Sequence, residues 1–80
     1  MEIQEFVVNF AEQFDDTEMD VFTPETAFRE LEEWSSLTGL AVLNMIAKKY
    51  DVKITPAELK SVETVIALFE LVHNSFTVDI

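Results

Sequence analysis

The 80-residue chain has the length of one small domain and is long enough to form one hydrophobic core. Sixteen acidic residues against five basic ones give a formal net charge of −11 at pH 7, which argues against nucleic acid as a partner. The chain has no cysteine, which excludes disulfides and thiolate metal sites, and no apolar run reaches the roughly 20 residues that span a bilayer. We therefore expect a single domain over residues 1–80, a cytoplasmic monomer without a metal site or a membrane span.

Apolar residues recur at helical spacing near the start of the chain and predict a first helix over residues 2–14. Phe10 lies in the middle of this pattern, and we expect it to be buried against the last helix. A long acidic connection follows and runs to Ser35. Three apolar residues are expected to hold this connection on the core: Phe22, Phe28 and Leu31.

The stretch from Trp34 to Tyr50 predicts the central helix. It opens with Ser35 and Ser36, and one of two adjacent serines is enough to cap a helix, so one hydroxyl is left over. Two apolar stripes follow on the helix, which indicates that the helix is either central or partly exposed for a partner. The stripes contain Leu37, Leu40, Leu43 or Asn44 and Ala47 in the first, and Val42, Met45 and Ile46 in the second.

Two further helices are predicted after the central one. Thr55-Pro56-Ala57-Glu58 is a capping box with proline at the first helical position, and it opens a short third helix that ends near Lys60. Core spacing over residues 64–74 predicts the last helix. The expected fold is all-α, a small four-helix bundle with three longer helices, a short third helix and a long loop between the first two.

The run Trp34-Ser35-Ser36-Leu37 resembles the modification site of the acyl carrier proteins, in which the pattern is Asp-Ser-Leu. Ser36 matches the family serine and Leu37 the leucine, whereas Ser35 stands in place of the aspartate. The segment 50–54 and the start of the last helix near Thr64 also fall at the family's usual distances, so the resemblance covers nearly the whole chain.

The resemblance implies that Ser36 bears a phosphopantetheine arm derived from coenzyme A and added by a phosphopantetheinyl transferase. The arm would hold acyl intermediates as thioesters and present them to acyl-transferring or acyl-processing enzymes. Fatty-acid-like biosynthesis or a specialised polyketide or lipid pathway would be the setting. The residues themselves do not suggest an enzyme, because a small bundle has little room for a cleft and the one histidine lies near the C-terminal end.

Two further sets of site residues complete the expectation. Partner docking is expected at Glu30, Glu32, Glu33, Ser35, Leu37 and Met45. An acyl cavity is expected between Val42, Ile46, Ile54 and Leu59, with simple packing against the third helix as the alternative for each of these side chains.

The chain departs from the family at several positions. Ala41, Ala47 and Lys48 stand where carrier proteins tend to have acidic docking residues, which favours a specialised pathway with its own partners. The missing aspartate at Ser35 supports an alternative function, an unmodified helical interaction module that retains the carrier fold.

Overall fold

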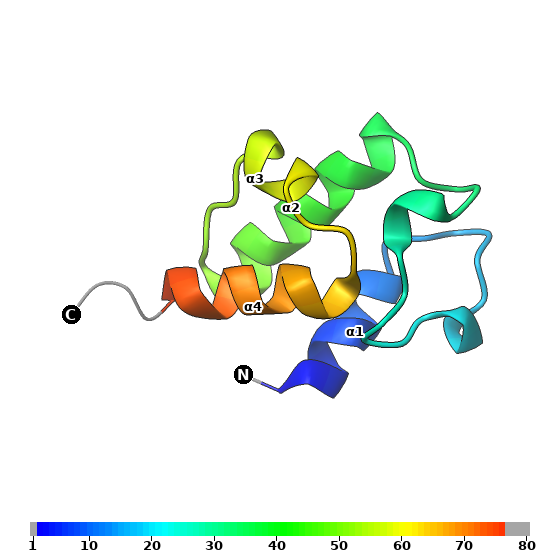
Figure 1. The fold of residues 1–80 in the computed structure, drawn as a ribbon, viewed down its shortest axis with the longest axis horizontal. Coiled ribbons are helices and arrows are strands. Elements are labelled where there is room, and N and C mark those ends of the chain that lie inside the picture. Colours follow the sequence, from blue (N-terminus) through cyan, green and yellow to red (C-terminus); the bar gives the residue numbers. More distant parts are fainter. Residues whose placement is uncertain (1, 77–80) are drawn as a thin grey trace.

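The computed structural model describes residues 2–76, and over that range it is an all-α bundle of four helices with no strand (Figure 1). The predicted fold class is therefore confirmed. The α-helices are α1 (Ile3–Ala11), α2 (Ser36–Tyr50), the short α3 (Pro56–Lys60) and α4 (Val65–Phe76). Two single-turn 3-10 helices lie in the long connection between α1 and α2, namely η1 (Met19–Val21) and η2 (Phe28–Glu30).

The first helix is shorter than its apolar pattern predicts. It ends at Ala11, yet Phe14 is still buried, because the amides of Gln13 and Phe14 bond the carbonyls of Phe10 and Ala11 in a tightened final turn. The apolar spacing thus continues for one turn beyond the regular helix.

Phe10 is fully buried, as its spacing predicts, and it lies among aromatic rings of the connection. Its ring centroid is 5.3 Å from that of Phe14, 5.4 Å from that of Phe28 and 6.0 Å from that of Phe22. The closest ring pair between α1 and α4 is instead formed by Phe6 and Phe69, at 5.5 Å. The expected anchoring of the connection by Phe22 and Phe28 is confirmed, since both are buried.

The connection also provides acceptors for the start of α4, on the side where the two approach in Figure 1. The amide of Val65 donates to the Thr26 carbonyl at 3.1 Å, and that of Ile66 donates to the Pro24 carbonyl at 2.8 Å. The Thr64 hydroxyl accepts from the Ala67 amide at 3.2 Å. The first-turn amides of α4, which have no partner within their own helix, are satisfied in this way.

The third helix begins with the predicted capping box. The Thr55 hydroxyl accepts from the Glu58 amide at 3.1 Å, and the Glu58 carboxylate accepts from the Thr55 amide at 2.9 Å. The Arg29 guanidinium of η2 donates to the carbonyls of Lys60 and Val62, which join α3 to α4. The connection is thereby bonded to the last residue of α3 and to the joint that follows it.

One hydrophobic core runs through the bundle and includes residues from every α-helix. None of the helices in residues 2–76 combines the length and the apolar character needed to cross a bilayer.

Candidate functional site

The two serines that open α2 have different structural roles. Ser35 is the N-cap, with extended backbone (φ −154°), and its hydroxyl accepts from the Thr38 amide at 3.3 Å. The Thr38 hydroxyl in turn donates to the Glu33 carbonyl at 2.9 Å. Ser35 therefore fixes where the helix begins.

Ser36 is the first residue of the helix and is exposed. Its hydroxyl makes no hydrogen bond to any residue that the structure describes. The amides of Ser36 and Leu37 belong to the first turn and have no helical acceptor. A free hydroxyl thus lies beside two free amides at the positive end of the helix dipole, an arrangement that suits a phosphate group.

The two apolar stripes of α2 face opposite environments. Val42, Met45 and Ile46 are buried in the core, whereas Leu37 is 78% exposed and Leu40 is 53% exposed. The sequence predicts that this helix is either central or partly exposed, and the structure shows one buried stripe and one that is largely exposed. Unpartnered leucines therefore adjoin the free serine.

An open groove of about 520 Å³ lies between α2 and α3, beside the two serines. This volume is within the range of small-molecule sites. We call it the α2–α3 groove. It is lined by Arg29, Trp34, Ser35, Ser36, Gly39, Leu40, Leu43, Pro56, Leu59 and Lys60.

Only one of the four residues expected at an acyl cavity borders this groove. Leu59 lines it, but Val42, Ile46 and Ile54 are packed in the core. For these three residues the packing interpretation describes the structure, and the open space lies one stripe further round α2. The sequence shows both stripes of α2 but does not show which of them turns toward the other helices.

Trp34 packs against the core at the end of the connection and also lines the groove. Its ring centroid is 4.8 Å from that of Phe28 and 6.3 Å from that of Phe14. The remaining residues of the groove wall, such as Gly39 and Pro56, carry no signal in the sequence that would assign them to a site.

Among the expected docking residues, Met45 is placed differently from the expectation. Its side chain is only 5% exposed and belongs to the core, which removes it from the surface that a partner would contact. The reason is its position on the same stripe as Val42 and Ile46. Glu30, Glu32 and Leu37 are exposed.

Glu33 is engaged within the protein and holds the chain after α1. Its carboxylate accepts from the amides of Asp15 at 2.7 Å and Asp16 at 3.0 Å, and from the Thr17 hydroxyl at 2.7 Å. The hydrogen bond from the Thr17 hydroxyl is the largest cause of a lowered pKa of Glu33. Burial opposes it, and the hydrogen bonds from backbone amides, each a smaller effect, lower the pKa further. Glu33 thus has a structural role that its position in an acidic run does not reveal.

Among residues 2–76, no group of three or more histidine, cysteine, aspartate or glutamate side chains is placed to hold a metal ion. Comparison of the chain with protein-family models, with curated proteins and with solved structures gives no match in any of the three. The geometry around Ser36 and the α2–α3 groove is therefore the basis for assigning a function.

Proposed function

We propose that this protein is a discrete acyl carrier protein whose phosphopantetheine arm is attached to Ser36. One observation carries the proposal: Ser35 uses its hydroxyl to cap α2, and this leaves the exposed Ser36 hydroxyl free at the same helix end. The resemblance of Ser36-Leu37 to the carrier-protein modification site supports the same assignment.

The residues around Ser36 fit a phosphodiester. The first-turn amides and the helix dipole favour a negative group there, and Arg29 and Lys60 border the adjacent groove. In the attachment step the Ser36 oxygen forms a bond to a phosphorus of coenzyme A, and the nucleotide part of coenzyme A leaves. The serine proton passes to a base of the phosphopantetheinyl transferase.

The bound arm supplies a terminal thiol that holds an acyl group as a thioester. The chain itself contributes a fixed attachment point and a contact surface. Leu37 and Leu40 provide exposed apolar area next to Ser36, and Glu30 and Glu32 add negative charge for basic partner enzymes. Acyl-transferring or acyl-processing enzymes of a specialised or fatty-acid-like pathway in the cytoplasm are the partners that this surface suits.

The test is a mass measurement after incubation with coenzyme A and a transferase of broad specificity. The parent protein gains the mass of one arm, Ser36→Ala gains none, and Ser35→Ala is still modified. Circular dichroism of both variants confirms that the bundle has folded before the masses are compared. Modification that persists in folded Ser36→Ala contradicts the assignment.

The second candidate is an unmodified helical interaction module. Ser35 in place of the family's aspartate favours it, because the acidic residue lies beside the modified serine in carrier proteins. If neither the parent nor Ser35→Asp accepts the phosphopantetheine arm, the interaction module is favoured. In that case the exposed leucines of α2 contact a protein partner, and no arm is attached.

A further inference from the structure

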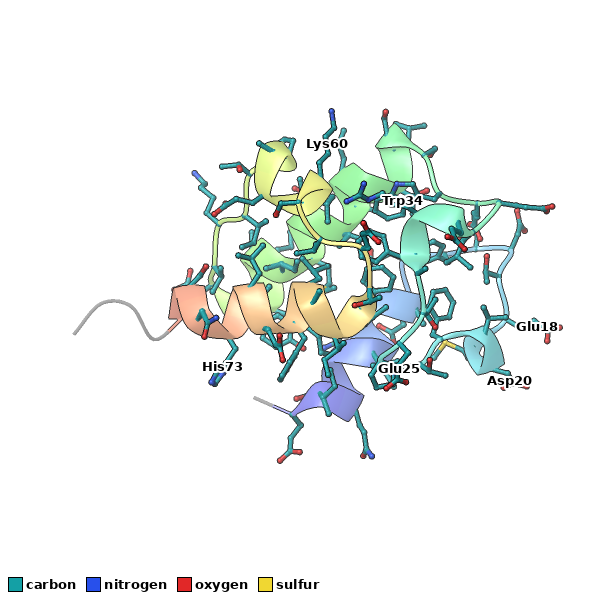
Figure 2. All side chains as sticks on the ribbon, in the orientation of Figure 1. Glu18, Asp20, Glu25, Trp34, Lys60 and His73 are labelled. Atoms are coloured by element: carbon teal, nitrogen blue, oxygen red, sulfur yellow. The ribbon has the colours of Figure 1, made fainter. Side chains whose placement is uncertain are left out.

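Most of the basic residues of this acidic protein lie near the end of α2. Three of the five lysines and arginines fall within residues 48–53, together with one acid, Asp51, so positive charge is in local excess there. In Figure 2 the labelled acids Glu18 and Asp20 lie at the lower right, whereas α2 ends toward the left, where the chain leaves for α3. Charges more than about 8 Å away are largely screened at physiological salt, so acids on the far side of the bundle have little effect here.

An open pocket of about 360 Å³ lies at this end of α2, beside the turn that follows α1. We call it the lysine pocket. It is lined by Gln13, Ala41, Asn44, Met45, Lys48 and Lys49, so no acidic residue of the described chain borders it. The residues from α2 share one face of the helix, because they are spaced by three, four and seven positions from Ala41 or by four from Met45.

The polar side chains of the lysine pocket are donors that the protein itself leaves largely unused. Lys48, Lys49 and the Asn44 amide form no ion pair or hydrogen bond with any residue in the described part of the chain. The Gln13 side-chain amide donates to the Asn9 carbonyl at 3.0 Å, which uses one of its two N–H groups. The helix dipole accounts for lysines in the last turn of α2, but it does not account for two amide groups that line the same space.

We propose that the lysine pocket binds a phosphate group, either free phosphate or the phosphate of a small monoester. Such a group carries up to two negative charges and several acceptor oxygens in a small volume, and lysine binds it as a point charge. Lys48 and Lys49 supply the positive charge, and the amides of Asn44 and Gln13 supply neutral N–H donors. A carboxylate has one charge and two oxygens, so it uses fewer of these donors at once.

This site is separate from the proposed attachment of an arm. Ser36 opens α2 and Lys48 lies in its last turn, roughly 18 Å further along the axis at about 1.5 Å per residue. The site is therefore tested on the unmodified protein and on Ser36→Ala, so that its failure and the failure of the carrier function are distinct results. We expect Ser36→Ala to bind phosphate as the parent does, and a loss of binding in folded Ser36→Ala would contradict this placement.

The probes are inorganic phosphate, glycerol 3-phosphate and succinate, a dianion whose charges lie on two separate carboxylates. Each is titrated at mildly alkaline pH and at constant ionic strength, with sodium chloride as the reference salt. NMR spectra of isotope-labelled protein report occupancy through the side-chain amide signals of Asn44 and Gln13, and the exposed Gln4, outside the pocket, is the internal control.

We expect both phosphates to shift the Asn44 and Gln13 signals at lower concentration than succinate, while the Gln4 signals stay in place. A stronger response to the ester assigns the pocket to a phosphorylated small molecule, and an equal or stronger response to inorganic phosphate assigns it to the free anion. Equal responses to phosphate and succinate, or no shift beyond that caused by chloride, would overturn the proposal.

A pair of double variants locates the site. Lys48→Gln/Lys49→Gln removes both cations of the pocket, and we expect it to weaken phosphate binding about tenfold. Lys53→Gln/Lys60→Gln makes the same change of net charge on two exposed lysines outside the pocket and is the matched control. An equal loss of affinity in the two double variants would show a general charge effect and contradict the site.

Asn44→Asp keeps the shape of the side chain and places a carboxylate in the pocket. The new charge lies four residues before Lys48, a spacing that favours the helix, and circular dichroism checks that the variant is folded. We expect phosphate to shift its Gln13 signals no longer, whereas Gln4→Glu, with the same charge change outside the pocket, should bind as the parent does. Phosphate binding of parental strength in Asn44→Asp would overturn the proposal.

Discussion

The Thr17 hydroxyl donates a 2.7 Å hydrogen bond to the Glu33 carboxylate and thereby joins the chain after α1 to the segment before α2. The backbone carbonyl of Glu33 accepts from the Thr38 hydroxyl in the first turn of α2. Glu33 therefore holds the start of the long connection with its side chain and the start of the central helix with its main chain. The position of the Ser35-Ser36 pair depends on both contacts.

The lowered pKa of Glu33 predicts a pH dependence of stability. The native state favours the ionised carboxylate, so the stabilisation is complete above the ordinary glutamate pKa of 4.5 and is lost as the pH falls through the lower native value. We expect Glu33→Gln to melt below the parent at neutral pH and the difference to shrink on acidification. Thermal melts followed by circular dichroism at several pH values measure this.

Glu32→Gln is the matched control, because it removes the same charge from an exposed neighbour that has no such donors. Relief of charge repulsion is common to both variants and cancels in the comparison. If the two melt alike at pH 7, the hydrogen bonds to Glu33 do not stabilise the bundle.

Most of the fold could be predicted from local patterns, and the site could be predicted only in part. Helical spacing and the Thr55 capping box depend on neighbours in sequence, so the sequence predicts both. It also predicts that one hydroxyl of the serine pair is not needed for capping. The facing of α2 depends on how the helices pack, and both of its stripes are apolar. For that reason the apolar pattern alone places Met45 on the surface and a cavity among Val42, Ile46 and Ile54, which the structure shows to be core residues.

The structural role of Glu33 could not be predicted from the sequence for a different reason. Its partners Asp15, Asp16 and Thr17 are 16 to 18 residues away, across a connection without regular spacing. A contact of that kind follows from the path of the loop, which the sequence pattern does not describe.

Phe10→Ala should lower the free energy of unfolding by about 3 to 5 kcal/mol, because it removes a fully buried ring from an aromatic cluster. A domain of this size has little more stability than that to lose, so much of the protein should be unfolded at room temperature. Urea denaturation checks the value. Val8, on the same helix, is 44% exposed, and Val8→Ala should change the free energy of unfolding by less than about 0.5 kcal/mol. A similar loss of stability in Phe10→Ala and Val8→Ala would contradict the assignment of Phe10 to the core.

Salt should stabilise the protein, because a net charge of −11 repels itself within a small compact state. We expect the melting temperature to rise between about 0.01 M and about 0.15 M salt, as the screening length falls from roughly 30 Å to 8 Å. Glu18→Gln, on the exposed connection, should raise the melting temperature more at low salt than at high salt. A melting temperature that does not respond to salt would show that the acids are too far apart to matter.

Gly39→Ala should raise the free energy of unfolding by up to about 1 kcal/mol, because alanine is the better helix former and its Cβ meets only ordinary contacts. Ala41→Gly in the same helix should lower it by a similar amount. Chemical denaturation of the two variants measures both changes. A loss of stability in Gly39→Ala would mean that the contacts with Trp34 and Leu59 tolerate less than the geometry indicates.

Substitution of Ser35 and of Ser36 should have different effects on the stability of the protein, because the two serines have different structural roles. Ser35→Ala removes the cap of α2 and should lower the free energy of unfolding by about 1 kcal/mol. Ser36→Ala removes a hydroxyl without a partner and should change it by less than about 0.5 kcal/mol. Equal losses in urea denaturation would show that Ser36 shares the capping role, which would remove the structural reason for its being free.

Ser35→Asp completes the comparison, since it restores the acidic residue that carrier proteins have before the modified serine. Aspartate caps a helix as well as serine does, and its charge is favourable at the helix N-terminus, so the variant should be as stable as the parent. We expect it to accept the phosphopantetheine arm faster than the parent when coenzyme A and a broad-specificity transferase are supplied. Initial rates from mass spectra taken over time measure this, with Ser35→Ala as the control for loss of the hydroxyl alone. If Ser35→Asp and Ser35→Ala are modified at the same rate, the acidic residue contributes nothing to recognition of Ser36, and the serine at position 35 is explained by capping alone.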